Sequence, residues 1–194
     1  MGKIYCVMGK SSTGKDTIYS RLMSQKDFNL KKIVPYTTRP IREGEVDGES
    51  YHFCTEDQLA KLEESGKIIE LRAYDTAYGI WKYFTVNDGQ IELDKNSYML
   101  IGTLEAYLKI KDYFGKEAVV PIYIEVEDGE RLQRALNRER AETTPKYDEL
   151  CRRFLADSED FSEENLKKAQ IEIRFENRQL EETIEKIKEY INEN

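Results

Sequence analysis

The chain has 194 residues, of which 39% are hydrophobic and 35% are charged, and its formal net charge is −8. This length suits one compact α/β domain with room for inserts, and the negative charge argues against nucleic acid or a membrane surface as a general partner. One histidine and three distant cysteines (Cys6, Cys54 and Cys151) argue against a zinc site and for free thiols in a reducing cytosol. Because no secretion signal or membrane-length apolar run is recognisable, we expect a cytoplasmic protein.

The first predicted element is a strand from Lys3 to Met8, and it leads into the sequence Gly-Lys-Ser-Ser-Thr-Gly-Lys-Asp-Thr. This spacing is typical of a phosphate-binding loop, in which glycines let the backbone N–H groups converge on a polyphosphate at a helix N-terminus. Lys15 adds a positive charge for the terminal phosphates. The alternative is a glycine-containing turn that carries a lysine by chance. The loop residues expected to bind the phosphates are Gly9, Ser11, Ser12, Thr13, Gly14, Lys15, Asp16 and Thr17.

Asp16 stands where a phosphate loop usually has Ser or Thr, whose hydroxyl helps to hold Mg²⁺. A carboxylate at this position can bind Mg²⁺ directly or through water, so Asp16 is a candidate metal ligand. The alternative role is structural, because an acidic residue in the first turn of a helix stabilises it by about 0.3–1 kcal/mol.

Residues 35 to about 92 are predicted to form an insert. Residues 37–48 are polar, charged and rich in turn formers, which indicates an exposed functional loop. Thr55-Glu-Asp-Gln58 is a capping box that opens a helix, which Gly66 ends. The other elements predicted up to residue 92 are a helix through Ile18, Leu22 and Met23, a strand over 30–34 ended by Pro35, and strands over 68–74 and 78–86.

The rest of the chain alternates strands with helices. Residues 98–103 and 119–126 are near-continuous apolar runs, as buried parallel strands require. A three-layer α/β fold of the P-loop type with a parallel central sheet is therefore predicted. The further elements are a helix over 104–113, charged helices over 128–142 and 147–156, a strand over 172–175 and a final helix with Leu180, Ile184, Ile187 and Ile191 on one face.

Arg39 and Arg42 lie three residues apart in the exposed loop, and Tyr51 follows. Two guanidinium groups and a phenol can bind a phosphate dianion through charge-assisted hydrogen bonds, although a solvated basic turn is an equally simple interpretation. A second arginine-rich segment lies near residues 134–140. An open phosphate site between two such segments suits phosphoryl transfer between two small anions.

The pattern Thr37-Thr-Arg-Pro-x-Arg-x-Gly-Glu-x-Asp-Gly48-x-x-Tyr51-x-Phe53 closely resembles the guanylate kinase family. The resemblance continues through Glu70, Tyr78-Gly79, the segment from Arg134 to Arg140, Arg153 and Asn177, and so covers nearly the whole chain. It implies a single domain with an inserted NMP-binding subdomain over 35–92 and a helical lid over 131–156. The core would then comprise residues 1–34, 93–130 and 157–194.

The resemblance implies the reaction ATP + GMP → ADP + GDP with Mg²⁺, by a monomer or dimer that needs neither nucleic acid nor membrane. Glu70 would accept hydrogen bonds from the guanine N1–H and amino group. The lid arginines Arg138 and Arg153 would close over the donor phosphates, and Asn177 would lie near the adenine. The implied NMP-binding residues are Arg39, Arg42, Tyr51, Glu70, Tyr78, Gly79 and Thr103, and the implied catalytic residues are Lys15, Arg39, Arg138 and Arg153.

Three positions depart from the family's usual pattern. Pro35 replaces a serine that assists guanine recognition, Ile80 replaces Ser or Thr, and Ile101-Gly-Thr103 replaces an Asp-x-Asp strand end. These changes affect the base-reading and metal-binding groups and leave the phosphate-binding groups intact. Two other functions therefore remain open: a kinase of the same fold for another monophosphate or a phosphosugar, and a non-catalytic guanylate-kinase-like binding module.

Overall fold

The computed structural model describes residues 1–76 and 79–194, and its centre is a five-stranded sheet. The strand order is β2-β7-β1-β8-β9, and every pairing is parallel. The central strand β1 is fully buried, which explains its continuous apolar sequence. The strands are β1 (Ile4–Met8), β2 (Lys31–Lys32), β7 (Tyr98–Ile101), β8 (Val119–Glu125) and β9 (Arg174–Glu176).

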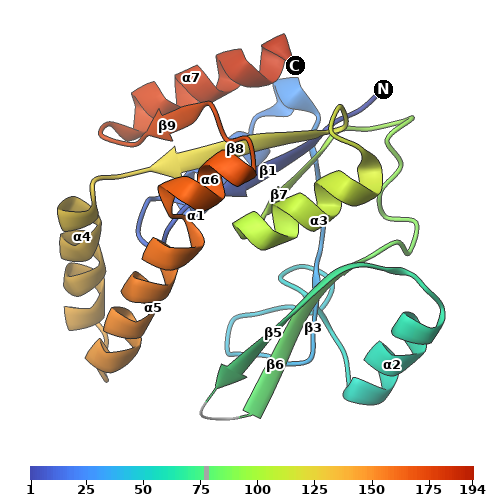
Figure 1. Ribbon diagram of the computed structural model, residues 1–194, viewed down its shortest axis with the longest axis horizontal. Helices are drawn as coiled ribbons and strands as arrows, with labels where there is room; N and C mark the ends of the chain where they lie inside the picture. Colours follow the sequence, from blue (N-terminus) through green and yellow to red (C-terminus); the bar gives the residue numbers. More distant parts are fainter. Residues whose placement is uncertain (77–78) are drawn as a thin grey trace.

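Helices cover both faces of this sheet, so the core has three layers as predicted (Figure 1). Alternate residues of β1 point to opposite faces. Ile4 and Cys6 pack in a cluster with α3 (Leu104–Phe114) and α6 (Glu163–Lys168). Tyr5 and Val7 pack on the other face with α1 (Lys15–Met23) and α7 (Leu180–Glu193). The apolar face predicted for the last helix is confirmed, because its three isoleucines are buried in this second cluster.

A second sheet of four strands projects from the core in the order β4-β3-β6-β5, with α2 (Glu56–Glu64) beside it (Figure 1). Its strands are β3 (Tyr36–Thr37), β4 (His52–Phe53), β5 (Ile68–Thr76) and β6 (Gly79–Val86). The predicted capping box is present, because the side chain of Thr55 and that of Gln58 each bond the other's backbone. Glu70 of β5 lies opposite Thr85 of β6 in the antiparallel pair.

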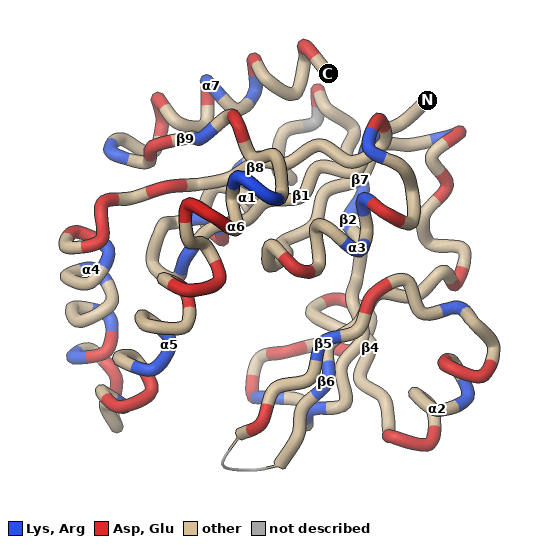
Figure 2. The backbone as a smooth tube through the Cα atoms, in the orientation of Figure 1, with Lys and Arg blue, Asp and Glu red and all other residues tan. Residues whose placement is uncertain are grey.

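A helical hairpin of α4 (Asp128–Arg140) and α5 (Tyr147–Asp160) projects on the side opposite the second sheet (Figure 1). Acidic and basic residues are interleaved along both helices (Figure 2). Over the part of the chain that the structure describes, no helix combines the length and apolarity needed to cross a bilayer.

Several predicted elements are displaced. The strand expected over 30–34 is only Lys31–Lys32, because the amide of Val34 donates to Oε1 of Gln90 (2.8 Å) instead of a neighbouring strand. The last strand is Arg174–Glu176 rather than 172–175. The helix expected to end at residue 156 continues to Asp160, and α6 and the short strands β3 and β4 were not predicted.

Candidate active site

The phosphate loop joins β1 to α1 in a conformation that depends on two glycines. Gly9 has φ +156° and Gly14 has φ +85°, in a region that other residues rarely adopt. A Cβ on Gly9 would collide with the carbonyl oxygen of Ile124, and one on Gly14 would lie 2.6 Å from Nδ2 of Asn177. Ser12 also has a positive φ of 66°. The loop is therefore tightly curled and closely surrounded.

Side chains from distant elements hold this loop in place. The buried Asn177, just after β9, donates from Nδ2 to the carbonyl oxygen of Thr13 (2.8 Å). Thr13 in turn donates from Oγ1 to the carbonyl oxygen of Lys10 (2.9 Å). Nζ of Lys10 lies 3.2 Å from Oδ1 of Asp128 at the start of α4. Asn177 thus contacts the loop backbone, and its predicted place near adenine stays a prediction.

Lys15, Asp16 and Thr17 form the first turn of α1 at the end of the loop. Nζ of Lys15 lies 3.8 Å from Oδ2 of Asp16, whose side chain is 79% exposed. Thr17 is also exposed. One lysine and one exposed carboxylate thus lie at the N-terminus of α1. Unpaired amides and the helix dipole favour anions at this position.

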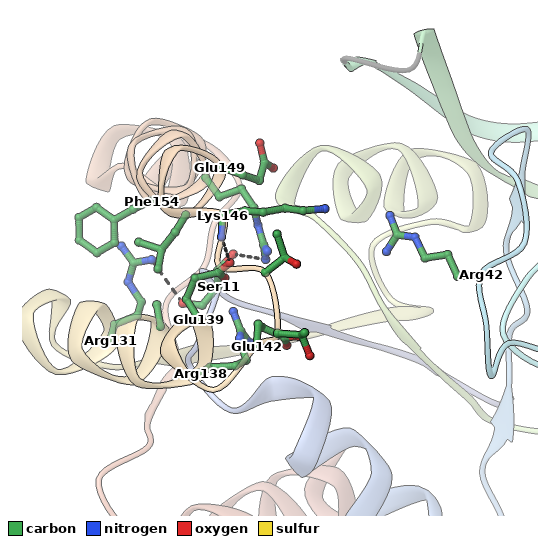
Figure 3. A pocket seen from close by; sticks show the side chains of 14 residues that line it. Ser11, Arg42, Arg131, Arg138, Glu139, Glu142, Lys146, Glu149 and Phe154 are labelled. Atoms are coloured by element: carbon green, nitrogen blue, oxygen red, sulfur yellow. Dashed lines mark hydrogen bonds between the residues drawn. The ribbon is translucent and has the colours of Figure 1, made fainter.

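The helical hairpin contacts the loop at Ser11 (Figure 3). Arg153 of α5 donates from Nη2 to Oγ of Ser11 (3.0 Å), and the N–H of Ser11 donates to Oδ2 of Asp157 (2.6 Å). The buried Arg131 of α4 donates from Nη1 to the carbonyl oxygen of Ser11 (3.3 Å) and stacks on Phe154, 4.0 Å from the ring centroid. The predicted lid residue Arg153 therefore does reach the phosphate loop.

A cavity of about 590 Å³ lies between the hairpin and the loop. Arg138, Arg153 and Lys146 line it on the hairpin side, and Arg42 borders it from the loop after β3 (Figure 3). Lys146 points across the space toward Arg42 (Figure 3). Three glutamates of the hairpin, Glu139, Glu142 and Glu149, also line the cavity. Basic groups from two separate inserts outnumber them there, an arrangement suited to polyanions.

Arg39 and Arg42 occupy different environments although they share one loop. Arg39 is buried and makes two hydrogen bonds to the carboxylate of Glu45, one of them 2.7 Å from Nη1 to Oε2. Its guanidinium lies over the ring of Tyr51, 5.1 Å from the centroid. The hydrogen bond from Arg39 lowers the pKa of Glu45 to about 2. Arg42 is exposed and lies 5.7 Å from the ring centroid of Trp81, so its charge is accessible to a ligand.

Glu70 lies at the base of a second cavity, of about 290 Å³, which Lys15, Tyr51 and Thr103 also line. Its side chain is 1% exposed. Oε1 accepts a hydrogen bond from Oγ1 of Thr85 (2.8 Å), and Oε2 accepts one from Nε of Arg72 (2.9 Å). Burial raises the pKa of the Tyr51 phenol above its ordinary value.

Tyr78 lies outside the described residues. Gly79 opens β6 with φ +107° and is exposed, and its carbonyl oxygen accepts a hydrogen bond from Oγ1 of Thr76 (2.7 Å). Ile80 is 60% exposed, whereas Pro35 lines the Glu70 cavity without a hydrogen-bond donor.

Sequence reasoning missed Arg72 and Thr85 in the Glu70 cavity, Arg131 in the cavity beside the hairpin, and Asp157, which accepts a hydrogen bond from the amide of Ser11. A signal existed for Arg72, because residues i and i+2 of a strand share a face and Arg72 follows Glu70 by two. Thr85 could be found only from the register of β5 on β6. Asp157 reaches Ser11 across 146 residues of sequence, and no local pattern indicates that contact.

A phosphate loop after the central strand of a parallel sheet, faced by arginines from two inserts, defines a P-loop protein of the phosphoryl-transfer class. A model of the guanylate kinase family matches residues 1–194. The chain therefore belongs to the guanylate kinase family, and it is a phosphotransferase.

Individual proteins agree with this assignment. The chain is 31% identical over 154 residues to the guanylate kinase of Caldanaerobacter subterraneus subsp. tengcongensis, covering 79% of this chain and 70% of that one. It is 29% identical over 161 residues to the guanylate kinase of Malacoplasma penetrans, covering 78% of this chain and 76% of that one. The crystal structure of guanylate kinase from Anaplasma phagocytophilum is similar in fold, with a TM-score of 0.68 at 21% identity over 98% of this chain and 85% of that chain.

Proposed function

We propose that this chain transfers the γ-phosphoryl group of ATP to GMP, forming ADP and GDP. The observation that carries the proposal is the shared cavity: Lys15 of the phosphate loop lines the same space as Glu70 and Tyr51 of the second sheet. A lysine suited to the migrating phosphoryl group thus adjoins a carboxylate suited to the base of an acceptor. In-line transfer requires this proximity and no covalent intermediate.

Glu70 selects the acceptor base in this proposal. Guanine presents two neighbouring donors, N1–H and the 2-amino group, and a carboxylate presents two acceptor oxygens. Adenine has an acceptor at N1, which would face an acceptor oxygen of the buried Glu70 with no proton between them. A buried polar group left unsatisfied costs about 1–3 kcal/mol, and more when it is charged, so we expect discrimination of at least about tenfold.

Arg42 and Arg39 bind the acceptor phosphate in different ways. Arg42 is exposed and available, so it makes the first contact with the phosphate. Arg39 is held by Glu45 and lies over Tyr51, and its hydrogen bonds to Glu45 and to the carbonyl oxygen of Pro40 use three of the five N–H donors of its guanidinium. It can therefore bind phosphate through the remaining donors while Glu45 keeps the buried charge paired.

On the donor side, the loop amides bind the ATP phosphates and Lys15 stabilises the charge on the migrating group. Arg138 and Arg153 add positive charge from the hairpin. The amide of Ser11 now donates to Asp157, so a phosphate oxygen would have to replace that carboxylate. We propose that residues 131–156 act as a lid and residues 35–92 as the acceptor-binding subdomain, and that both close over the bound substrates and exclude water.

The residues at the loop fit a Mg²⁺ ion that is held partly by the protein and partly by the phosphates of the nucleotide, as in kinases. Mg²⁺ is usually held by one or two carboxylates, phosphate oxygens and waters. Asp16 supplies one open carboxylate beside Lys15, and the described residues contain no group of three or more potential metal ligands that would form a complete protein site. Asp16 would therefore hold the ion, which when bound neutralises part of the phosphate charge.

The proposal is tested by coupled ADP release with a panel of nucleoside monophosphates and phosphosugars. GMP or dGMP should be the best acceptor, IMP the next and AMP a poor one. The enzyme would be cytoplasmic, where ATP and GMP are available. A higher kcat/KM for AMP, CMP or a phosphosugar would contradict the assignment of the acceptor while leaving the kinase class intact.

A further inference from the structure

Arg72 is the charged residue of the Glu70 cavity that the proposed reaction has not yet used. It follows Glu70 by two residues on β5, and both side chains line the cavity. The side chain of Arg72 is 13% exposed, and its guanidinium also contacts Tyr74. A largely buried arginine beside this carboxylate bears on which bases the site accepts, because it supplies hydrogen-bond donors where Glu70 supplies acceptors.

The hydrogen bonds of Arg72 differ in length. Nε donates to Oε2 of Glu70 at 2.9 Å, whereas Nη2 donates to Oε1 of Glu70 at 3.3 Å and Nη1 donates to Oγ1 of Thr103 at 3.3 Å. The guanidinium has five N–H donors, so these bonds do not exhaust its capacity. The two terminal nitrogens make the longer contacts and are the ones a ligand can most easily redirect.

The carboxylate of Glu70 is already nearly saturated. It offers about four lone-pair sites, and it accepts from Thr85 once and from Arg72 twice. Guanine brings two donors, so one present donor must leave. The Nη2 bond is the longest of the three and the one that guanine would displace. In guanine the 2-amino group, the N1–H and the 6-oxygen follow one another along one edge of the base. When the first two groups bond to Glu70, the 6-oxygen therefore faces a donor that lies beside Glu70.

We propose that Arg72 donates a hydrogen bond to the 6-oxygen of the acceptor purine and is, with Glu70, a specificity-determining residue. This inference rests on the proposed phosphorylation of GMP. Arginine is the side chain that most often recognises guanine at O6 and N7 in nucleic acids. Pro35 lines the same cavity without a donor, so Arg72 supplies the contact to the oxygen. The 6-amino group of adenine would meet the guanidinium donor to donor.

A simpler role for Arg72 is to neutralise the buried charge of Glu70 without touching the base. The two roles predict different substrate ratios. A contact to O6 makes Arg72 important only for purines with a good acceptor at position 6. Neutralisation of Glu70 makes Arg72 equally important for every purine that bonds to Glu70 through N1–H.

The test compares kcat/KM for GMP, 6-thio-GMP and IMP, below the pH at which the thiopurine loses its N1 proton. Sulfur at position 6 is a weak acceptor, whereas N1–H and the 2-amino group are kept. The unmodified enzyme should prefer GMP to 6-thio-GMP by about tenfold or more. In Arg72→Met this ratio should fall to near one, and the GMP-to-IMP ratio should remain unchanged because IMP lacks only the 2-amino group.

Arg174→Met is the matched control, because Arg174 is also paired with glutamates but lies outside the Glu70 cavity, and it should keep both ratios. The proposal is overturned if the unmodified enzyme shows no preference for GMP over 6-thio-GMP. It is also overturned if Arg72→Met lowers kcat/KM for both substrates by the same factor. If Arg72→Met does not fold, Arg72→Leu, which likewise has no donor, decides by the same ratio: it should fall to near one, and an unchanged ratio overturns the proposal. Failure of the proposed function is distinct, because GMP itself would then not be phosphorylated.

Discussion

The ligand-binding groups of the phosphate loop and those of the Glu70 cavity are held in place in different ways. The loop takes its shape from its own glycines and from hydrogen bonds to its backbone, both from the neutral Asn177 and from the charged Arg131 and Asp157 of the hairpin. In the acceptor region, by contrast, Arg39 is paired with Glu45 and Glu70 with Arg72. The donor side thus presents mainly backbone groups, of which the amide of Ser11 is paired with Asp157, whereas the acceptor side presents charged side chains held in internal pairs. We therefore expect substrate selection to depend on these ion pairs.

The largest effect is expected on the donor side, from Lys15→Ala. Because this change removes the charge that stabilises the migrating phosphoryl group, kcat should fall by about 10²–10³-fold, as for the loss of a single electrostatic donor elsewhere. Turnover is measured by coupled ADP release, and thermal unfolding should be unchanged. Lys10→Ala is the control from the same loop, since Lys10 pairs with Asp128, and it should keep most of the activity. More than a few per cent residual turnover in Lys15→Ala would contradict the role of Lys15.

The next largest effect separates the two arginines of the acceptor loop. Arg42→Ala should lower kcat/KM for every acceptor by about 10–100-fold, because it removes a charged hydrogen bond to phosphate. The melting temperature should not change, since Arg42 is exposed. Arg39→Ala should weaken all acceptors as well and should also lower the melting temperature, because it empties a buried site and leaves Glu45 without its partner. Equal melting temperatures for the two variants would show that the Arg39–Glu45 pair has no structural role.

Glu70→Gln should reduce the ratio of kcat/KM for GMP over AMP by about tenfold. The amide keeps the size of the side chain but replaces one acceptor oxygen with a donor, so guanine loses a partner and adenine does not. The ratio is measured in the same assay, with Arg42→Ala as the variant that should preserve it. An unchanged ratio in Glu70→Gln would mean that another group reads the base.

Asp16→Ala should raise the Mg²⁺ concentration that gives half-maximal rate by a few-fold, because it removes the one protein carboxylate beside Lys15. The measurement is the rate as a function of Mg²⁺ at saturating ATP and GMP. Asp16→Asn is the matched control, since it retains an oxygen ligand without the charge and should give a smaller shift. Identical metal titrations in all three proteins would leave Asp16 only its role at the helix N-terminus.

The smallest effect concerns pH. The pKa of Glu45 is lowered to about 2 in the folded protein by its hydrogen bonds to Arg39. A lowered folded-state pKa stabilises the fold above the unfolded value, which for Glu is about 4.3, and this contribution is lost as the pH falls toward 2. The melting temperature should therefore fall between pH 5 and pH 2, and Glu45→Gln should be less stable at pH 6 with a shallower decline. Parallel curves for the two proteins would show that Glu45 does not contribute.

The sequence predicted the features that depend on neighbouring residues. The strand–loop–helix pattern identified the phosphate loop, the Thr55–Gln58 pair identified a helix start, and the isoleucines of α7 identified a buried face. The charged pairs could not be predicted in this way, because their partners meet only when the chain folds. Glu45 lies in the same loop as Arg39, but only the folded loop brings the carboxylate onto the guanidinium. Thr85 meets Glu70 through strand register, and Asp157 meets Ser11 through the packing of α5.

The central claim is that the phosphate loop and the Glu70 cavity serve one transfer reaction. Its most direct test is a single-turnover reaction of the enzyme with ATP labelled in the γ-phosphate and unlabelled GMP, quenched and separated by chromatography. We expect the label to appear at the β-phosphate of GDP, with little inorganic phosphate. Label released only as inorganic phosphate, with no labelled GDP, would contradict it.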